Sequence, residues 1–256
     1  MQEPSALGRI VELVRDLRRR CPWDAAQTPQ SLRPYLVEEV MELDHALGSG
    51  NADQIRTELG DLLLHLAFQI VLGEERGEFG AEDVTGATEQ KMWRRHPHLF
   101  EQGDKPESWE RSKLNDVDGK GSVLDGLPPT LPALVMALRL QERAAGVGFD
   151  WPDTTGPREK IAEEVAELDV ELDGAHDQGR IEDEIGDVLF AVTNLARKVG
   201  CDPRAALEKA NDRFRKRFHG IERLAEQRGI DMATAGLEVL DALWDEVKSG
   251  HTDLPH

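Results

Sequence analysis

Apolar residues recur with the period of an α-helix along almost the whole chain. Two stretches show this most clearly, with intervals of four, three and four residues: Leu36, Val40, Leu43 and Leu47, then Ile161, Val165, Leu168 and Leu172. Residues at these intervals lie on one face of a helix. The strict alternation of apolar and polar residues that marks a half-buried strand is hard to find in the sequence. The pattern therefore predicts an all-α protein built from helical bundles.

The sequence also contains an internal repeat. The segment "EEVMELDHAL" begins at Glu38, "EEVAELDVEL" begins at Glu163, and seven of the ten aligned residues are identical. A second match pairs "ELGDLLLHLAF", from Glu58, with "EIGDVLFAVTN", from Glu184, and two shorter matches follow in the same order. Four matches that recur in the same order indicate a tandem duplication.

A segment of different composition separates the two copies. Residues 115–132, "NDVDGKGSVLDGLPPTLP", are rich in Gly, Pro and Asp and lack the apolar period, which is typical of a linker. We therefore predict an N-terminal helical domain at residues 1–114 and a C-terminal one at residues 133–256. In the second domain, Asp202 followed by Pro203 predicts a helix start, because Asp caps free N–H groups and Pro fits the first helical position.

Each copy carries four carboxylates that the helical period places at the edge of the apolar stripe of two successive helices. They are Glu164, Glu167, Glu184 and Asp187 in the second copy, and Glu39, Glu42, Glu58 and Asp61 in the first. If the two helices pack antiparallel through their apolar stripes, the four carboxylates meet, which is costly without a cation. Oxygen donors without His or Cys suit Mg²⁺ or Mn²⁺ better than Zn²⁺.

Acidic residues are common in this chain, so the pattern needs support. With 50 acidic residues, a single Glu-Glu-x-x-Glu is most often a solvated helix face. The repeated combination with a following Glu-x-Gly-Asp favours a metal site. Gly60 and Gly186 within that motif also indicate close approach of another backbone, because glycine inside a helix costs about 1 kcal/mol relative to alanine.

Composition limits the partners and the compartment. The net charge of −19 argues against a nucleic-acid polymer as the main partner, so an anionic ligand would need a metal ion or locally placed basic residues. Cys21 and Cys201 form neither a zinc motif nor a disulfide framework. The longest mainly apolar stretch, residues 62–72, is too short to span a bilayer, and the first residues do not resemble a signal peptide. We expect a cytoplasmic protein without a membrane partner.

Three further motifs accompany the carboxylates: "CPWDAAQT" from Cys21, "RRHPHLF" from Arg94 and "VGFDW" from Val147. Together these residues resemble the MazG family of tandem-domain nucleoside triphosphate pyrophosphohydrolases. The resemblance implies the all-α pyrophosphohydrolase fold, a homodimer and binding of nucleoside triphosphates such as ATP. It also implies Mg²⁺-dependent hydrolysis to the monophosphate and pyrophosphate, by attack of a metal-activated water at the α-phosphorus, with Mn²⁺ as a substitute.

The resemblance also assigns residue roles. It implies that Glu164, Glu167, Glu184 and Asp187 bind the metal and that Glu163 orients or deprotonates the water. It implies nucleotide contacts for one further set: Lys160, Arg180, Asp183, Arg215, Lys216, Arg217, Trp244 and Lys248. On residue type alone, Trp244 fits a core aromatic as well as a stacking surface for the base. Lys160 and Arg180 likewise fit a solvated helix face.

The two copies differ around the carboxylates. Three aligned pairs change charge or size: Lys160 with Tyr35, Arg180 with Gln54, and Asn211 with Glu89. Because a triphosphate is held by charge-assisted hydrogen bonds, we predict that the C-terminal half dominates catalysis. Several basic and aromatic residues persist in the first copy, so weak or differently selective activity there stays open: Lys91, Arg94, Arg95, Trp109 and Lys113.

Two alternatives to this interpretation stay open. The chain could be a regulatory helical module that binds a nucleotide or a partner protein without turnover, although the full acidic set in both copies disfavours this. It could also share the fold but act on dUTP or a phosphoribosyl nucleotide, which the tandem layout and "CPWD" disfavour. The sequence does not distinguish base or sugar preference.

Overall fold

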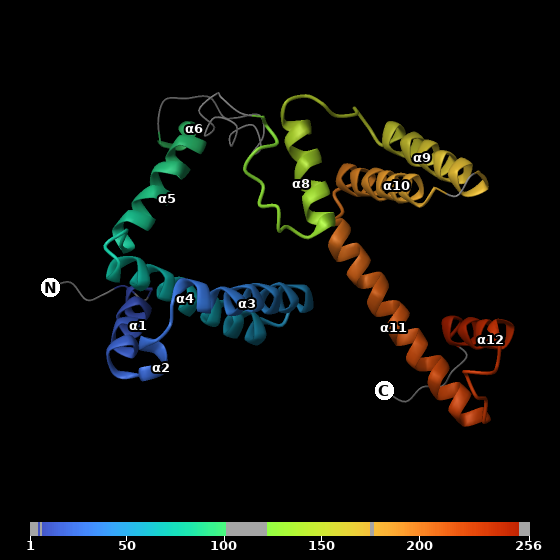
Figure 1. Ribbon diagram of the computed structural model, residues 1–256, viewed down its shortest axis with the longest axis horizontal. Helices are drawn as coiled ribbons and strands as arrows, with labels where there is room; N and C mark the ends of the chain where they lie inside the picture. Colours follow the sequence, from blue (N-terminus) through green and yellow to red (C-terminus); the bar gives the residue numbers. More distant parts are fainter. Residues whose placement is uncertain (1–4, 6, 101–121, 175–176, 251–256) are drawn as a thin grey trace. The chain divides into compact units, whose positions relative to one another are not determined.

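The computed structural model describes residues 5, 7–100, 122–174 and 177–250. All regular elements in these ranges are helices, so the predicted all-α class is confirmed (Figure 1). The chain divides into two compact units, residues 1–118 and 119–256, at a point inside the predicted linker. Trp109 and Lys113 lie outside the described residues.

None of the helices in the described ranges combines the length and the apolar character needed to cross a membrane.

The N-terminal unit contains six helices within its described residues: α1 (Gly8–Arg20), α2 (Pro22–Ala25), α3 (Pro29–Ser49), α4 (Ala52–Glu75), α5 (Ala81–Arg95) and α6 (Pro97–Phe100). Helices α3 and α4 form an antiparallel hairpin, and α1 packs against α4 (Figure 1). The hairpin bends at Gly50, whose φ of 70° ends α3, and Asn51 caps α4. The core joins α1, α3 and α4 through Val14, Leu32, Ala67, Phe68, Val71 and Leu72.

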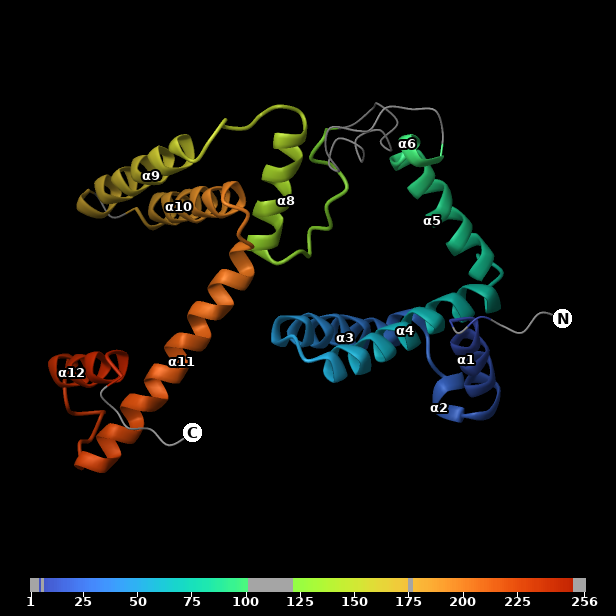
Figure 2. The same cartoon turned by 180° about the vertical axis from the view of Figure 1, so that it is seen from behind.

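The C-terminal unit contains five helices within its described residues: α8 (Ala133–Gly146), α9 (Thr155–Asp173), α10 (Gln178–Lys198), α11 (Pro203–Arg228) and α12 (Leu237–Lys248). Helices α9 and α10 form a second hairpin, which α8 contacts through α10, and α12 packs back onto α11 (Figure 2). Asp202 accepts hydrogen bonds from the N–H groups of Arg204 and Ala205, with Pro203 at the first helical position, so the predicted helix start is confirmed.

The apolar stripes of the hairpins are not buried as the sequence pattern led us to expect. Val165 of α9 is 41% exposed and Leu189 of α10 is also exposed, whereas Glu164 is only 4% exposed. The hairpin interface therefore encloses a carboxylate, and much of the apolar surface faces outward. The periodicity identified the helices correctly but not the face through which they pair, because a stripe can equally be covered by another chain.

Candidate metal and nucleotide site

The carboxylates of the second copy gather where α9 and α10 pair. Glu164, Glu184 and Asp187 each offer an oxygen, and these atoms lie within 4.8 Å of one another. Glu163, Glu164 and Glu167 form an overlapping group of the same size, so Glu164 belongs to both. The spacing of three residues between members on each helix puts them on one side. All four predicted metal ligands of this copy therefore lie in one connected cluster.

Lys160 adjoins this cluster from one turn earlier on α9. Its Nζ donates to Glu163 Oε1 at 2.8 Å and lies 2.5 Å from Glu164 Oε1. The hydrogen bonds to Glu163 and then to Glu164 hold the pKa of Lys160 above its usual range. Partial desolvation, followed by repulsion from Glu164, raises the pKa of Glu167. The cluster therefore combines crowded negative charge with one adjacent cation.

Two hollows flank the carboxylate cluster. One, of about 310 Å³, is lined by Trp151, Pro157, Lys160, Glu164, Asp187, Phe190, Ala191 and Asn194. The other, of about 490 Å³, is lined by Glu163, Ala166, Glu167, Val170, Glu171, Arg180 and Glu184. In the second hollow, Arg180 forms an ion pair with Glu171. Both sides of the cluster thus offer room for a ligand beside a basic side chain.

The loop before α9 sets the wall of the first hollow. Arg197 and Lys198 of α10 bind the Asp150 carboxylate, at 2.5 and 3.1 Å, and Lys198 also donates to the Trp151 carbonyl oxygen. A Cβ added at Gly156 would lie 2.0 Å from Trp151 Cδ1, so only glycine permits this packing of the indole. The "GFDW" motif therefore positions Trp151 beside the carboxylates.

Several residues that the resemblance linked to the nucleotide lie elsewhere in the unit. They are Arg215, Lys216 and Arg217 on α11, and Trp244 and Lys248 on α12. Trp244 packs against the α11–α12 core, 5.4 Å from the Phe214 ring centroid, and Arg217 lies 5.6 Å over its indole. The basic cluster lies in the middle of α11, and α12 packs against α11 (Figure 2). Within one chain, these residues do not meet the carboxylate cluster.

Asp183 and the two helical glycines, Gly60 and Gly186, were also singled out from the sequence. Asp183, also linked to the nucleotide, is exposed on α10 and directly precedes Glu184. A Cβ added at Gly60 or Gly186 would meet no atom within 4 Å among the described residues. The expectation that another backbone approaches these glycines is therefore wrong for the single chain.

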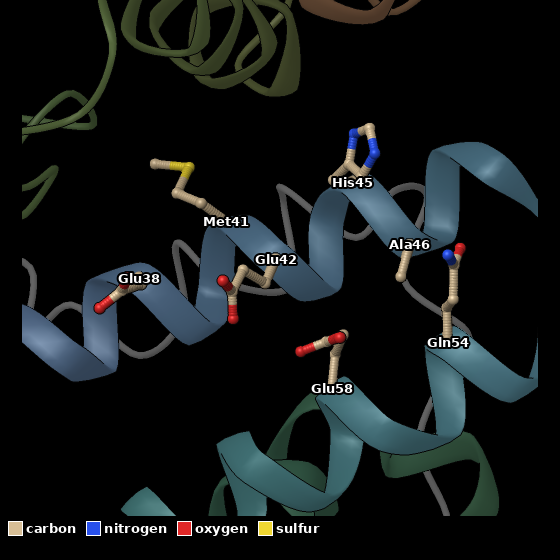
Figure 3. Close-up of a pocket in the computed structure, with 7 residues that line it drawn as sticks. All are labelled: Glu38, Met41, Glu42, His45, Ala46, Gln54 and Glu58. Carbon is tan, nitrogen blue, oxygen red and sulfur yellow. The ribbon is translucent and has the colours of Figure 1, made fainter.

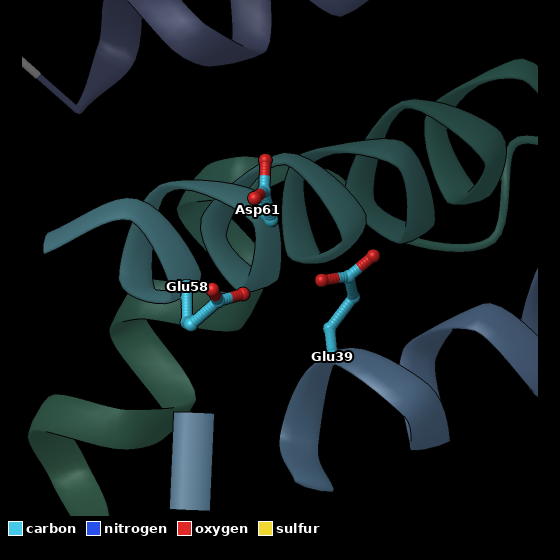
Figure 4. Close-up of side chains that lie close together, drawn as sticks. All are labelled: Glu39, Glu58 and Asp61. Carbon is cyan, nitrogen blue, oxygen red and sulfur yellow. The ribbon is translucent and has the colours of Figure 1, made fainter. Parts of the chain in front are cut away.

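The first copy builds a similar cluster between α3 and α4. Glu39 reaches from α3 toward Glu58 and Asp61 on α4, and oxygens of the three lie within 4.8 Å of one another (Figure 4). Glu42 is not part of that group; it faces Glu58 across the neighbouring hollow, of about 410 Å³ (Figure 3). That hollow is lined by Glu38, Met41, Glu42, His45, Ala46, Gln54 and Glu58. These positions align one by one with those lining the hollow beside Arg180.

Sequence reasoning missed one residue that lies beside this cluster. His65 of α4 has its Nε2 3.6 Å from Glu39 Oε1, and its ring stacks on Tyr35 with centroids 6.4 Å apart. Burial lowers the pKa of His65 despite the opposing charge of Asp61, so the imidazole is neutral near pH 7. A signal was available in the sequence, since His65 follows Asp61 by four residues, about one helical turn, and aligns with Ala191 in the second copy.

Comparison with known proteins identifies relatives that match nearly the whole chain. The model of the MazG nucleotide pyrophosphohydrolase domain matches residues 27–100. A nucleoside triphosphate pyrophosphohydrolase of Escherichia coli K12 is 39% identical over 264 residues, covering 99% of this chain and 100% of that protein. The nucleoside triphosphate pyrophosphohydrolase/pyrophosphatase MazG of Thermotoga maritima is 42% identical, covering 94% of this chain and 95% of its own length. The chain therefore belongs to the MazG nucleotide pyrophosphohydrolase family.

Proposed function

We propose that this protein hydrolyses (deoxy)nucleoside triphosphates to the monophosphate and pyrophosphate, and that the α9–α10 site performs the reaction. The observation that carries the proposal is the carboxylate cluster beside Lys160, in a chain nearly coextensive with relatives named nucleoside triphosphate pyrophosphohydrolases. Attack at the α-phosphorus needs an activated water and cations around the phosphates. Carboxylates, a lysine and an arginine supply side chains of those types.

The donor set of the α9–α10 cluster fits a hard divalent cation. Every candidate donor is a carboxylate oxygen, which suits Mg²⁺ and permits Mn²⁺. Glu164, Glu167, Glu184 and Asp187 would hold the ion. Once bound, Mg²⁺ supplies an activated water and offsets phosphate charge. We expect Glu163, which is exposed beside the cluster, to accept a proton from the attacking water, and Lys160 to donate to a phosphate oxygen.

We expect the protein to form a homodimer through the α9–α10 hairpin. The α9–α10 hairpin leaves large apolar side chains exposed, among them Val165, Val170, Ile185, Leu189 and Val192. Large apolar side chains exposed on one hairpin are typical of subunit interfaces. A second copy covering it would also bring further residues toward the site, which gives the distant α11–α12 set a route to the nucleotide. Leu189→Glu is expected to convert the dimer to monomer in light scattering coupled to size exclusion, while exposed Val199→Glu is not.

The compartment is part of the same proposal. Nucleoside triphosphates are cytoplasmic metabolites, and both cysteines of the chain, Cys21 and Cys201, are free thiols. We therefore place the reaction in the cytoplasm.

Isotope transfer from water tests the reaction. The purified chain is incubated with a panel of ribo- and deoxynucleoside triphosphates in H₂¹⁸O, with Mg²⁺ or with a chelator. We expect pyrophosphate release only with Mg²⁺, and ¹⁸O in the monophosphate because water attacks the α-phosphorus. Release of orthophosphate, or ¹⁸O in pyrophosphate, contradicts the proposed bond cleavage. Nucleotide that raises the melting temperature without turnover, across the panel, favours the regulatory module instead.

A further inference from the structure

The first hollow, of about 310 Å³, leads from the carboxylate cluster to a buried amide. Asp187, Phe190 and Asn194 line it from a single face of α10, because they lie three and four residues apart. Asp187 belongs to the carboxylate cluster. Asn194 follows it after two helical turns, about 10 Å along the helix axis. Trp151 lines the same hollow, so a ligand extending from the carboxylates would pass aromatic surface before it reaches the amide.

The amide of Asn194 is held in one orientation. Its Oδ1 accepts hydrogen bonds from Arg197 Nε at 3.0 Å and from Arg197 Nη2 at 2.8 Å. The guanidinium group donates in turn to Asp150 in the loop before α9. Because a guanidinium group only donates, turning the amide over would set N–H groups against N–H groups. The amide nitrogen therefore stays on the side away from Arg197.

The amide nitrogen of Asn194 is available to a ligand. The residue is only 7% exposed, and its Nδ2 makes no hydrogen bond with any residue that the structure describes. Side chains as buried as this normally satisfy their donors. Nδ2 is also not among the unpartnered atoms that are sealed from solvent in the described ranges. Since Asn194 lines the hollow and its oxygen is turned to Arg197, the hollow offers a ligand N–H donors at this position.

The two aromatic walls of the hollow are fixed by contacts behind them. Lys198 donates to the Trp151 carbonyl oxygen, and Gly156 leaves room for the indole. Gln141 of α8, which is 6% exposed, donates to the carbonyl oxygen of Phe190 at 2.8 Å. Both aromatic side chains are still more than a third exposed, so they keep surface for a ligand. Aromatic faces beside a polar group suit a planar, polar ring such as a nucleobase.

The N-terminal copy carries an apolar residue where the C-terminal copy carries this amide. Phe68 aligns with Asn194 and is buried in the core that joins α1, α3 and α4. Leu64 stands in place of Phe190. The amide donor therefore belongs to the half in which Lys160 also lines the hollow.

We propose that the first hollow receives the base of the nucleotide, and that Asn194 selects bases with a carbonyl oxygen over bases with an amino group at the same ring position. The inference rests on the proposed function, in which the carboxylates hold the triphosphate. Counted from the phosphates, the base lies beyond the sugar, as Asn194 lies beyond the carboxylates. A carbonyl oxygen accepts from Nδ2, whereas an amino group would meet another donor and leave both unpaired.

Turnover of matched substrate pairs tests this preference. ITP is compared with ATP and UTP with CTP, because the members of each pair differ chiefly in a carbonyl or an amino group at one ring position. We expect kcat/KM to favour ITP and UTP by about tenfold or more, the effect of leaving a buried donor unpaired. Asn194→Asp keeps the shape of the side chain and places a carboxylate oxygen where the amide nitrogen was. The preference within each pair should reverse in that variant.

A matched pair of variants tests the orientation of the amide. Arg197→Met removes the group that holds the Asn194 oxygen, and Lys198→Met removes the other cation bound to Asp150. Both changes loosen the loop before α9, but only the first lets the amide turn over and accept from an amino group. The preference should fall toward one in Arg197→Met and persist in Lys198→Met, with melting curves as the folding control. If Arg197→Met does not fold, Asn194→Asp and the unchanged chain still decide the proposal.

The outcomes separate this inference from the proposed function. Pyrophosphate release with equal kcat/KM within both pairs overturns the role of Asn194 and leaves the proposed reaction standing. A preference that Asn194→Asp leaves unchanged has the same meaning. If Asn194→Asp instead alters the preference between UTP and dUTP, the amide contacts the sugar and the assignment of the base is wrong. Absence of turnover with every nucleotide overturns both proposals.

Discussion

The α3–α4 and α9–α10 hairpins hold corresponding carboxylates, yet the groups around those carboxylates differ. Glu164 lies beside the ammonium group of Lys160, while Glu39 lies beside the neutral imidazole of His65. A cation next to the cluster can also attract phosphate, whereas a neutral ring cannot. We therefore expect the N-terminal half to bind a polyanion less tightly, although both halves carry the acidic set.

The second charge difference between the hairpins is smaller than the alignment alone suggests. Arg180 aligns with neutral Gln54, but Arg180 is paired with Glu171, which aligns with neutral Ala46. The N-terminal half has therefore lost one cation and one anion at this position, which leaves the local charge unchanged. Lys160 and Arg180 both align with neutral residues, and Lys160 therefore accounts for most of the charge difference between the two hairpins.

The largest expected difference between the two halves is the loss of activity when one carboxylate is removed from each. Glu164→Gln is expected to lower pyrophosphate release at least about 100-fold, because even losing a partner of a metal ligand lowers affinity or activity by about 10- to 100-fold. Glu39→Gln should leave most activity intact. Both variants are measured at saturating Mg²⁺, with melting curves as the folding control. Loss of turnover in Glu39→Gln alone would reverse the assignment of the active half.

Lys160 gives the second test of the difference between the two halves. Lys160→Met keeps the length of the side chain but removes its charge. We expect KM for the triphosphate to rise about 10- to 100-fold, since a charge-assisted hydrogen bond contributes about 1.5 to 3 kcal/mol. Steady-state kinetics with pyrophosphate detection give kcat and KM separately.

The reverse exchange provides the matched control for Lys160. In the Glu164→Gln background, Tyr35→Lys with His65→Ala gives the N-terminal half the residue pair of the C-terminal half. Nucleotide affinity of that half, measured by calorimetry with Mg²⁺, should increase. A fall in kcat with unchanged KM in Lys160→Met would indicate that Lys160 does not hold the triphosphate.

The helices and the clustering of carboxylates could be predicted because both follow from local spacing. Members three residues apart lie on one side of a helix, so a hairpin brings Glu184 and Asp187 to Glu164. Asp202 and Pro203 marked a helix start for the same local reason. These features need no knowledge of how distant parts of the chain pack.

Features that depend on packing between helices were not predictable in this way. Val165 belongs to the apolar stripe of α9 but is exposed. The spacing of apolar residues identifies the stripe and does not tell which part of the protein, or which second chain, covers it. The contact between His65 and Glu39 spans the hairpin and becomes visible only when the facing positions are known. The ion pair of Arg180 with Glu171 likewise joins two helices and changes the meaning of an aligned substitution.

The Arg180–Glu171 pair gives a smaller test. Arg180→Gln alone leaves the Glu171 carboxylate, whose side chain is 12% exposed, without its partner at the edge of the hollow. We expect KM for the triphosphate to rise by up to about fivefold, the change that 1 kcal/mol produces. Arg180→Gln with Glu171→Ala copies the N-terminal pair and should restore KM to nearly its original value. If the double variant is as impaired as Arg180→Gln, Arg180 itself contacts the substrate and the halves differ at two positions.

Without metal, replacing Glu39 and replacing Glu164 should change the stability of the protein in opposite directions. Burial, followed by repulsion from Asp61, raises the pKa of Glu39. Further repulsion comes from Glu42, Glu58 and Glu38, and the facing His65 is neutral. In a chelator at pH 8, Glu39→Gln is therefore expected to raise the melting temperature by a few degrees, since it removes a partly buried, repelled charge. Glu164→Gln should lower it instead, because Glu164 is paired with Lys160.

The pH dependence of the Glu39 effect follows from linkage. Because the folded protein binds the Glu39 proton more tightly than the unfolded chain does, the stability associated with that proton is present below the unfolded pKa. It is lost as pH rises through the folded pKa. The gain from Glu39→Gln should thus be larger at pH 8 than at pH 5, as melting curves in chelator would measure. Exposed Glu38→Gln serves as the control. An equal gain at both pH values would mean that packing of the amide, and not relief of charge, stabilises the variant, and the contrast between the two hairpins would then not be electrostatic.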